Sequence, residues 1–371
     1  MAEMIPVRMP KWGLSMQEGA ITHWWKAEGE RLVEGEDLVD IETSKINNVC
    51  EAPTAGVLRR IVAQEGETLP VGALMAVVAD PAVSDAELDA FIADFQANFT
   101  PEDEDGDAVS ALALSQVDIG GRTIRIGRAG EGGAVPIVLI HGYSGDLNNW
   151  LFNLEALSAR GPVVAVDLPG HGGSSKAVGD GGLTSLAEAV VAALEVSGVT
   201  KAHLVGHSLG AAVAARIAAD RPDLAQSLIL IAPASLPGTA VSEAFLTGVI
   251  EAQRARDLKP WMEMLVADPA MVTKDMVEDV LKFTRMDGVE DALSLIRDRL
   301  VSGQDAAELR EDLADIPKAL VIASHRDQIV GAPDEAALPP GFRVVWMDDA
   351  GHMPHLEKAG EVNALIIEAV G

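Results

Sequence analysis

The sequence has a single cysteine and few positive charges for its length of 371 residues. One cysteine, Cys50, excludes an internal disulfide framework and favours a reducing compartment. The formal net charge of −29 argues against DNA or an anionic membrane as a partner. The sequence also lacks an apolar run of membrane-spanning length, a secretory signal at its start, and any metal-ligand spacing among its eight histidines. These absences favour a cytoplasmic protein that binds neither nucleic acid, membrane nor metal.

The first eighty residues contain an internal repeat, in a chain long enough for two or three domains. Gly19-Ala-Ile21 recurs 37 residues later as Gly56-Val-Leu58. Glu28-Gly-Glu30 recurs in the same way as Glu65-Gly-Glu67. Each half alternates apolar and polar residues in short runs separated by glycine, which is the pattern of strands and tight turns. Two such halves predict a small β-sandwich in which each half buries the apolar face of the other.

Lys45 lies between two strand-like runs, 38–41 and 46–49, in a polar stretch that separates the halves of the repeat. The pattern predicts a hairpin with Lys45 at its tip, projecting from the domain. Taken by itself, such a lysine is an ordinary solvated side chain. The runs around it, however, resemble those of a lipoyl (biotinyl-like) carrier domain. The matching runs are Met9–Met16, Ile41-Glu-Thr-Ser-Lys45, Glu51-Ala-Pro53 and Gly56-Val-Leu58.

This resemblance covers residues 1–80 and implies lipoate joined by an amide to Lys45. In the family the usual run is Glu-Thr-Asp-Lys, and in this chain Ser44 replaces the aspartate. The departure is mild, because the lysine keeps its position and the acidic Glu42 remains nearby. Biotin is disfavoured, since its acceptor lysine normally lies between methionines, which are absent here.

An acidic connection is expected over residues 81–116, because Asp and Glu recur there without any Lys or Arg. Within it, Ser84-Asp-Ala-Glu87 is a capping-box signature that predicts a helix over about 84–99. Apolar residues follow at helical spacing on one face: Leu88, Phe91, Ile92, Phe95 and Phe99. We expect this face to pack onto the domain that follows, with docking to another subunit as the alternative. The charged run 100–107 then predicts a flexible arm.

The stretch 202–212 has the pattern of a G-x-S-x-G nucleophile elbow. An apolar run ends at Gly206-His-Ser-Leu-Gly210 and continues as a small-residue helical pattern. The two glycines are needed because a Cβ at either position would clash with the neighbouring strand or helix. Ser208 would then lie at a helix N-terminus, where N–H groups favour a developing anion. A serine of ordinary pKa is a poor nucleophile, so it needs a base and an orienting acid.

Candidates for both follow in the chain. Asp327 comes just after the predicted strand 319–323, and His352 comes just after the predicted strand 342–347. Serine, acid and histidine in this order, each of the last two beyond a strand, are typical of α/β-hydrolases. Asp348 and Asp349 are the alternative acids.

Further runs extend this resemblance to the α/β-hydrolase family over residues 117–371. The apolar run 135–140 leads into His141-Gly-Tyr143, and 163–174 reads as another strand and loop. The resemblance implies an oxyanion hole formed by the backbone N–H groups of Tyr143 and Leu209. It also implies a cap over the active site, for which the helical pattern from about 236 to 315 is the candidate.

Neighbouring polar residues have simpler expected roles. His355 is expected to pack in the interior, and His141 and His207 are expected to shape their turns. Glu357 is expected to start a helix rather than to take part in catalysis.

The two domains together indicate acyl transfer. A lipoyl domain carries an acyl group as a thioester, and a serine triad takes an acyl group from an ester or thioester. The whole chain resembles a family that joins the two, the dihydrolipoamide acetyltransferase (E2) component of bacterial acetoin dehydrogenase systems. Acyltransferases of other 2-oxo acid dehydrogenase complexes carry a His-x-x-x-Asp-Gly motif. In this chain Phe283 stands where that motif, read back from Asp287, would have its histidine.

The resemblance implies acetyl transfer from S-acetyl-dihydrolipoyl-Lys45 to coenzyme A, whose phosphates have Arg254, Arg256 and Lys259 as candidate ligands. The implied partners are a thiamine-diphosphate-dependent acetoin dehydrogenase (E1) and a flavin-dependent dihydrolipoamide dehydrogenase, and we expect a homo-oligomer. The residues alone leave two alternatives open. One is a thioesterase or esterase that passes the acyl group to water, and the other is a non-catalytic assembly platform.

We predict that protein purified from a lipoylating host carries one lipoyl amide on Lys45. Intact mass should exceed the sequence mass by that increment, and the mass of the peptide containing Lys45 should locate it. A biotinyl increment, or a lipoyl group on another lysine, would contradict the prediction.

Overall fold

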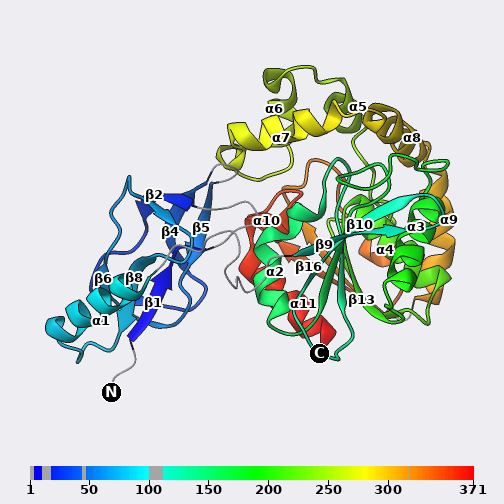
Figure 1. Cartoon of the computed structure of the whole chain (residues 1–371). Coiled ribbons are helices and arrows are strands. Elements are labelled where there is room, and N and C mark those ends of the chain that lie inside the picture. Colours follow the sequence, from blue (N-terminus) through cyan, green and yellow to red (C-terminus); the bar gives the residue numbers. More distant parts are fainter. Residues whose placement is uncertain (1–3, 11–17, 44–46, 100–111, 317) are drawn as a thin grey trace. The chain divides into compact units, whose positions relative to one another are not determined.

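The computed structural model describes residues 4–10, 18–43, 47–99, 112–316 and 318–371. The chain divides into two compact units, Met1–Val109 and Ser110–Gly371 (Figure 1). Lys45 and the charged run 100–107 lie outside the described residues. Within the described segments, no helix is both long and apolar enough to cross a membrane.

The first unit is a sandwich of two four-stranded sheets. One sheet has the order β1 (Met4–Arg8), β8 (Leu74–Ala79), β6 (Gly56–Ile61), β3 (Arg31–Leu32). The other has the order β5 (Asn47–Glu51), β4 (Asp37–Glu42), β2 (Glu18–Trp24), β7 (Thr68–Pro70). The two orders are equivalent under the repeat: β8, β6 and β3 of one sheet stand at the same positions as their counterparts β4, β2 and β7 of the other sheet. The predicted all-β sandwich built from a repeat is confirmed.

Paired residues of the repeat have the same structural role. Ile21 and its counterpart Leu58 are at most 1 % exposed, and both lie in the core between the sheets. Gly29 and Gly66 adopt φ angles of +90° and +88°, in the left-handed region that favours glycine. The N–H of Gly29 donates to the carbonyl of Leu58, and that of Gly66 to the carbonyl of Ile21, each at 2.7 Å. The repeat therefore reflects one turn and one core position used twice.

Strands β4 and β5 pair antiparallel, with Glu42 opposite Asn47. Such a pairing needs a short connection, and the chain supplies it with residues 43–46. The predicted carrier lysine belongs to this connection, of which only Thr43 is described.

The helix predicted over about 84–99 is α1 (Asp85–Asn98), and Ser84 and Glu87 form the predicted capping box. Its expected packing onto the following domain is wrong. Its apolar face instead packs against β8 of the sandwich, in a cluster of Leu74, Val77, Ala79, Val83 and Leu88 with Phe91, Ile92 and Phe95 against it. The reason lies in β8, whose residues are all buried. Met75, Ala76 and Val78 face the sandwich core, so the apolar residues on the opposite face of β8 require a cover of their own.

The second unit is built on an eight-stranded sheet. Its strand order is β16 (Phe342–Met347), β15 (Ala319–Ser324), β14 (Ala225–Ile231), β13 (Ala202–His207), β11 (Ile137–Ile140), β12 (Val163–Val166), β10 (Thr123–Ala129), β9 (Ala113–Asp118). Strand β10 pairs antiparallel with both of its neighbours, β9 and β12, and the strands from β12 through β11 and β13 to β16 pair in parallel. The α/β-hydrolase fold expected from the sequence is confirmed.

The first strand of this sheet begins earlier than expected. Strand β9 starts at Ala113, inside the stretch 81–116 in which the sequence analysis expects a connection between domains. It is an edge strand on which only Val117 is buried, so it lacks the apolar alternation that marks a strand in sequence.

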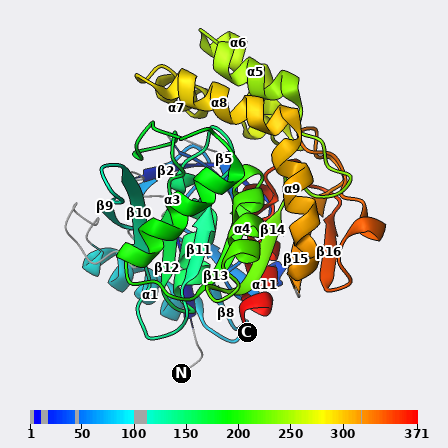
Figure 2. The ribbon, with the colours of Figure 1, turned by 90° about the vertical axis from the view of Figure 1, so that its right-hand side faces the viewer.

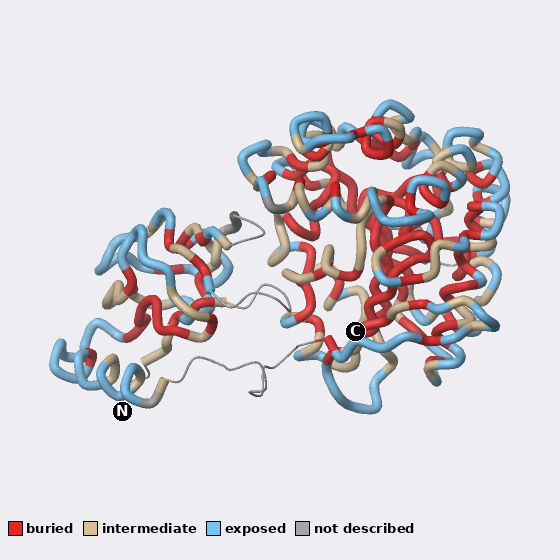
Figure 3. Tube along the Cα trace, turned by 45° about the horizontal axis from the view of Figure 1, so that its top comes forward, coloured by how far each residue is buried: buried red, intermediate tan, exposed pale blue. Residues whose placement is uncertain are grey.

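Helices cover the sheet. Those outside the cap are α2 (Leu151–Ser158), α3 (Leu183–Val196), α4 (Leu209–Asp220), α10 (Pro354–Glu357) and α11 (Ala359–Val370). Helices α3 and α4 pack together against one face of the sheet (Figure 2), and α2 packs on α11. The buried residues follow the strands through the middle of this unit (Figure 3).

The described stretch between β14 and β15 is mainly helical, as expected for a cap. It holds α5 (Glu243–Glu251), α6 (Ala255–Glu263), α7 (Lys274–Thr284), α8 (Val289–Ser302) and α9 (Gln304–Asp312). Helices α5 to α8 group at one end of the unit (Figures 1 and 2). Helix α9 instead packs beside α4. The apolar side chains of the cap continue the core of the sheet, since Phe245, Leu258 and Leu293 belong to the same buried cluster as Ile140 and Leu209.

Leu88→Ala should destabilise the first unit by about 2–5 kcal/mol, because it opens a cavity between α1 and β8. Leu88 is fully buried, whereas Val33 of the same unit is 65 % exposed and provides the control substitution Val33→Ala. Hydrogen–deuterium exchange of the full chain should accelerate in peptides of α1 and β8. Faster exchange in the second unit instead would mean that α1 packs there.

Candidate active site

Ser208 occupies a sharp turn between β13 and α4. Its φ and ψ of 55° and −115° are strained for a residue with a Cβ. The flanking glycines are sterically required. A Cβ on Gly206 would meet the carbonyl oxygen of Gly210, and a Cβ on Gly210 would meet that of Ile140. The strand, turn and helix expected from the G-x-S-x-G pattern are therefore present, with Ser208 6 % exposed.

His352 and Asp327 are in contact. The Nδ1 atom of His352 lies 2.8 Å from Oδ2 of Asp327, and both side chains are 2 % exposed. If the Nδ1 hydrogen is donated to this carboxylate, Nε2 of the neutral ring remains available as a base. The other oxygen of Asp327 accepts the N–H groups of Ile329 and Val330 at 2.7 and 3.1 Å.

The charge state of Asp327 suits an acceptor for the Nδ1 hydrogen of His352. Burial by itself would raise the pKa of its carboxyl group. The charge of His352, the hydrogen bond to its ring and the two backbone N–H groups outweigh burial and hold the pKa of Asp327 below its usual value. The group is therefore an anion at neutral pH.

The structure does not bring the two alternative acids to His352. Asp348 lies 3.5 Å from the His325 ring, and Asp349 lies 3.2 Å from the Arg326 guanidinium group. Their side chains are 87 % and 70 % exposed, so they belong to the solvated surface.

The main chain of His352 is held from two further directions. Its N–H donates to the carbonyl of Leu265 in the cap at 2.8 Å. Its carbonyl accepts a hydrogen bond from Nε2 of His207, the residue before the nucleophile, at 2.8 Å. His207 was expected only to shape its turn, and it also joins the elbow to His352. The sequence contained no signal for either contact, because the partners are 87 and 145 residues apart.

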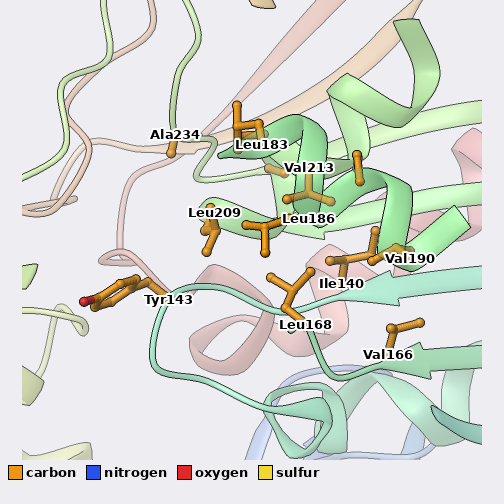
Figure 4. Close-up of a cluster of buried hydrophobic side chains, with 14 of the residues drawn as sticks. Ile140, Tyr143, Val166, Leu168, Leu183, Leu186, Val190, Leu209, Val213 and Ala234 are labelled. Carbon is orange, nitrogen blue, oxygen red and sulfur yellow. The ribbon is translucent and has the colours of Figure 1, made fainter. Parts of the chain in front are cut away.

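The two predicted oxyanion-hole residues belong to segments that adjoin Ser208. Leu209 is the first residue of α4. Tyr143 follows Gly142, where a Cβ would lie 3.1 Å from the Cβ of Ser208, so this loop runs directly beside the serine. The Tyr143 phenol donates to the carbonyl of Leu293 in α8 at 3.0 Å, and burial raises its pKa. Tyr143 belongs to the same buried cluster as Ile140 and Leu209, and Figure 4 shows its ring pointing away from these two side chains.

His355 is buried, as expected for a packing residue, and His141, which was expected to shape its turn, is buried as well. Nε2 of His141 accepts the N–H of Leu168 at 3.0 Å, and its Nδ1 lies 2.7 Å from the carbonyl oxygen of Gly142. The ring of His355 contacts those of His207 and Trp150, with centroids 4.4 and 4.7 Å apart. Burial lowers the pKa of His355 to about 3, so this ring is neutral near pH 7.

Glu357 lies in the single turn of α10, as expected for a residue at the start of a helix, and it also makes long-range contacts. Its carboxylate accepts the N–H of Ala267 in the cap at 2.6 Å and the N–H of Gly351 at 2.8 Å. The sequence could not show this, because Ala267 is 90 residues away.

The cations considered for coenzyme A phosphates are exposed at the start of α6. Arg256 lies 3.6 Å from Asp257, and Lys259 lies 3.5 Å from Glu263. Arg254 is the N-cap residue of the helix. No described contact joins these three residues to Ser208 or His352.

Comparisons with known proteins match both units. The family model described as "Alpha/beta hydrolase family" matches residues 137–365, and the one described as "Biotin-requiring enzyme" matches residues 5–78. A protein of Cupriavidus necator is 42 % identical over 99 % of this chain and 98 % of its own length. One of Pseudomonas putida is 44 % identical over 98 % and 97 %. Both are named "Dihydrolipoyllysine-residue acetyltransferase component of acetoin cleaving system".

The chain belongs to this acetyltransferase family. The family resemblance inferred from the sequence is thereby confirmed, and the first unit is a lipoyl domain. A solved structure of similar fold is the meta-cleavage product hydrolase from Pseudomonas fluorescens. It has a TM-score of 0.61 and 20 % identity, and the match covers 68 % of this chain and 96 % of that one. At this identity the likeness concerns the fold of the second unit.

Asp327→Asn should lower the rate at which a fluorophosphonate labels Ser208 by about 10³–10⁴-fold, because the ring of His352 loses the acceptor that fixes its tautomer. Asp348→Asn and Asp349→Asn are matched controls, and each should change the rate by less than about twofold since both carboxylates are on the surface. A large effect of either control, with Asp327→Asn active, would move the acid to that position.

Proposed function

We propose that the protein transfers an acetyl group from S-acetyl-dihydrolipoyl-Lys45 to coenzyme A through Ser208, with His352 as base and Asp327 as orienting acid. The observation that carries the proposal is the His352–Asp327 pair beside a strained serine elbow, in a chain whose first unit is a lipoyl domain. The lipoyl group, when bound, would supply the acetyl group as a thioester.

The residues of the second unit account for both half-reactions. Ser208 Oγ attacks the thioester carbonyl while His352 Nε2 accepts its proton. The backbone N–H groups of Tyr143 and Leu209 stabilise the oxyanion, each by a few kcal/mol. His352 returns the proton to the departing sulfur, which leaves an acetyl ester on Ser208. His352 then takes the proton of the coenzyme A thiol, whose sulfur attacks the ester, and gives that proton back to Ser208.

The names of the two relatives favour transfer over hydrolysis. Both are acetyltransferase components, which supports coenzyme A as acceptor against the thioesterase and esterase alternative. The burial of Ser208, which is 6 % exposed, and of His352, which is 2 % exposed, is compatible with either acceptor. The Asp327–His352 pair likewise supports catalysis against a non-catalytic platform.

The proposed partners follow from the acetyl donor. Relatives of this chain are components of an acetoin cleaving system, so other components of that system belong to the proposal. A thiamine-diphosphate-dependent acetoin dehydrogenase would load the lipoyl arm, and a flavin-dependent dihydrolipoamide dehydrogenase would reoxidise it. The proposal includes a homo-oligomer and a cytoplasmic location, where a reducing environment suits both the single cysteine and the thiol chemistry.

The lipoylated protein, given S-acetyl-dihydrolipoamide and coenzyme A, should form acetyl-CoA. Ser208→Ala should lower that rate by about 10³-fold or more, because it removes the acyl acceptor. Ser324→Ala is the matched control, since Ser324 is also buried yet lies at the end of β15, outside the proposed machinery.

Product analysis separates the alternatives. Free acetate that forms at the same rate with and without coenzyme A would identify a hydrolase. Absence of turnover by correctly folded, lipoylated protein would favour the assembly platform.

A further inference from the structure

The carboxylate of Glu357 joins the cap to the loop that carries His352. One oxygen accepts the N–H of Ala267, which comes after α6, and the other accepts the N–H of Gly351, the residue before the base. A carboxylate is suited to this position because it only accepts hydrogen bonds, and both neighbours are donors. A single side chain thus fixes two segments that are far apart in the sequence.

Further contacts tighten the same junction. The carbonyl of Leu265 accepts the N–H groups of His352 and Met353 at 2.8 and 3.2 Å. Gly351 lies so close to the cap that a Cβ there would be 2.7 Å from the nitrogen of Ala267. The cap segment 265–267 and the loop 351–353 therefore form one packed unit, which we term the cap–base junction.

The side chains around the cap–base junction include several titratable groups. The charged and titratable groups that face His352 are Asp327 of the acid loop, His207 of the elbow, and His355 and Glu357 of α10. Burial lowers the pKa of His207 well below its usual value and that of His355 to about 3, so both rings are neutral. Asp327 and Glu357 are then the carboxylates whose charge acts on His352.

Burial and hydrogen bonding shift the pKa of Glu357 in opposite directions. Burial raises the pKa of Glu357, while the N–H groups of Ala267 and Gly351 lower it, and burial prevails. Its negative charge is therefore fully present above this raised pKa and is lost as the pH falls through it.

We infer that Glu357 is a positioning residue that acts through His352: it holds the loop 351–353 against the cap, and its negative charge acts on the ring of His352. The inference rests on the proposed role of His352 as base. It does not depend on which acyl donor or acceptor the protein uses.

Two substitutions in the full chain separate geometry from charge. Glu357→Gln removes the charge and turns one acceptor into a donor that faces a backbone N–H. Glu357→Asp keeps the charge but is too short to reach both N–H groups. Glu361→Gln is the matched control, because Glu361 is an exposed carboxylate in the first turn of α11.

The measurement is the rate of fluorophosphonate labelling of Ser208 between pH 5 and 9. Rates are taken per labelled site, so that misfolded molecules do not contribute. Labelling requires neutral His352, so the rate rises with pH along an acid limb. Glu357→Gln should lower the plateau rate about tenfold and move the acid limb to lower pH by about half a unit or more, because an anion near the imidazolium is lost. Glu357→Asp should lower the plateau while its acid limb stays near that of the unsubstituted protein.

The result for Glu357→Gln decides whether the inference about Glu357 holds. A plateau and acid limb like those of Glu361→Gln would overturn the inference, and so would a lowered plateau with an unmoved limb, which would leave only a structural role. A shifted limb without acetyl-CoA formation would uphold the inference while the proposed function fails.

Discussion

The second unit depends on the way in which three distant segments hold His352. Its ring nitrogen contacts Asp327, its carbonyl accepts from His207, and its N–H donates to Leu265. These partners come from the acid loop, the elbow and the cap. Because a buried backbone or ring group without a partner is costly, the fold in which all three are satisfied is strongly favoured over neighbouring arrangements. The orientation of His352 thus depends on contacts from across the second unit.

The first unit, the lipoyl domain, is built from a repeated structural element. Its repeat uses one turn and one core position twice, so two similar halves can close on each other. The exception is β8, which is apolar on both faces. A strand of that kind cannot face water, and α1 supplies the missing cover. Helix α1 is therefore part of the carrier unit, although it comes after the last strand of the sandwich.

A buried serine and a carrier domain have complementary chemical requirements. Transfer of an acyl group to a thiol requires a site that excludes water. The cap contacts two loops that lie near Ser208 and His352. Tyr143 contacts α8, and the junction built around Glu357 holds the loop before His352. The cap is thus joined to the loops proposed to carry the oxyanion hole and the base.

The sequence by itself determined the two fold classes, the nucleophile elbow and the order of serine, acid and histidine. These features are visible as local sequence patterns, such as the glycines at 206 and 210, although the backbone that requires Gly210 belongs to Ile140 in a neighbouring strand. The sequence could not rank Asp327 against Asp348 and Asp349, because all three follow a strand and only their distance to His352 separates them. It misplaced α1 and did not show the long-range contacts of Glu357 for a related reason. Which surface covers an apolar face, and which backbone N–H meets a carboxylate, depends on segments that only the tertiary structure brings together.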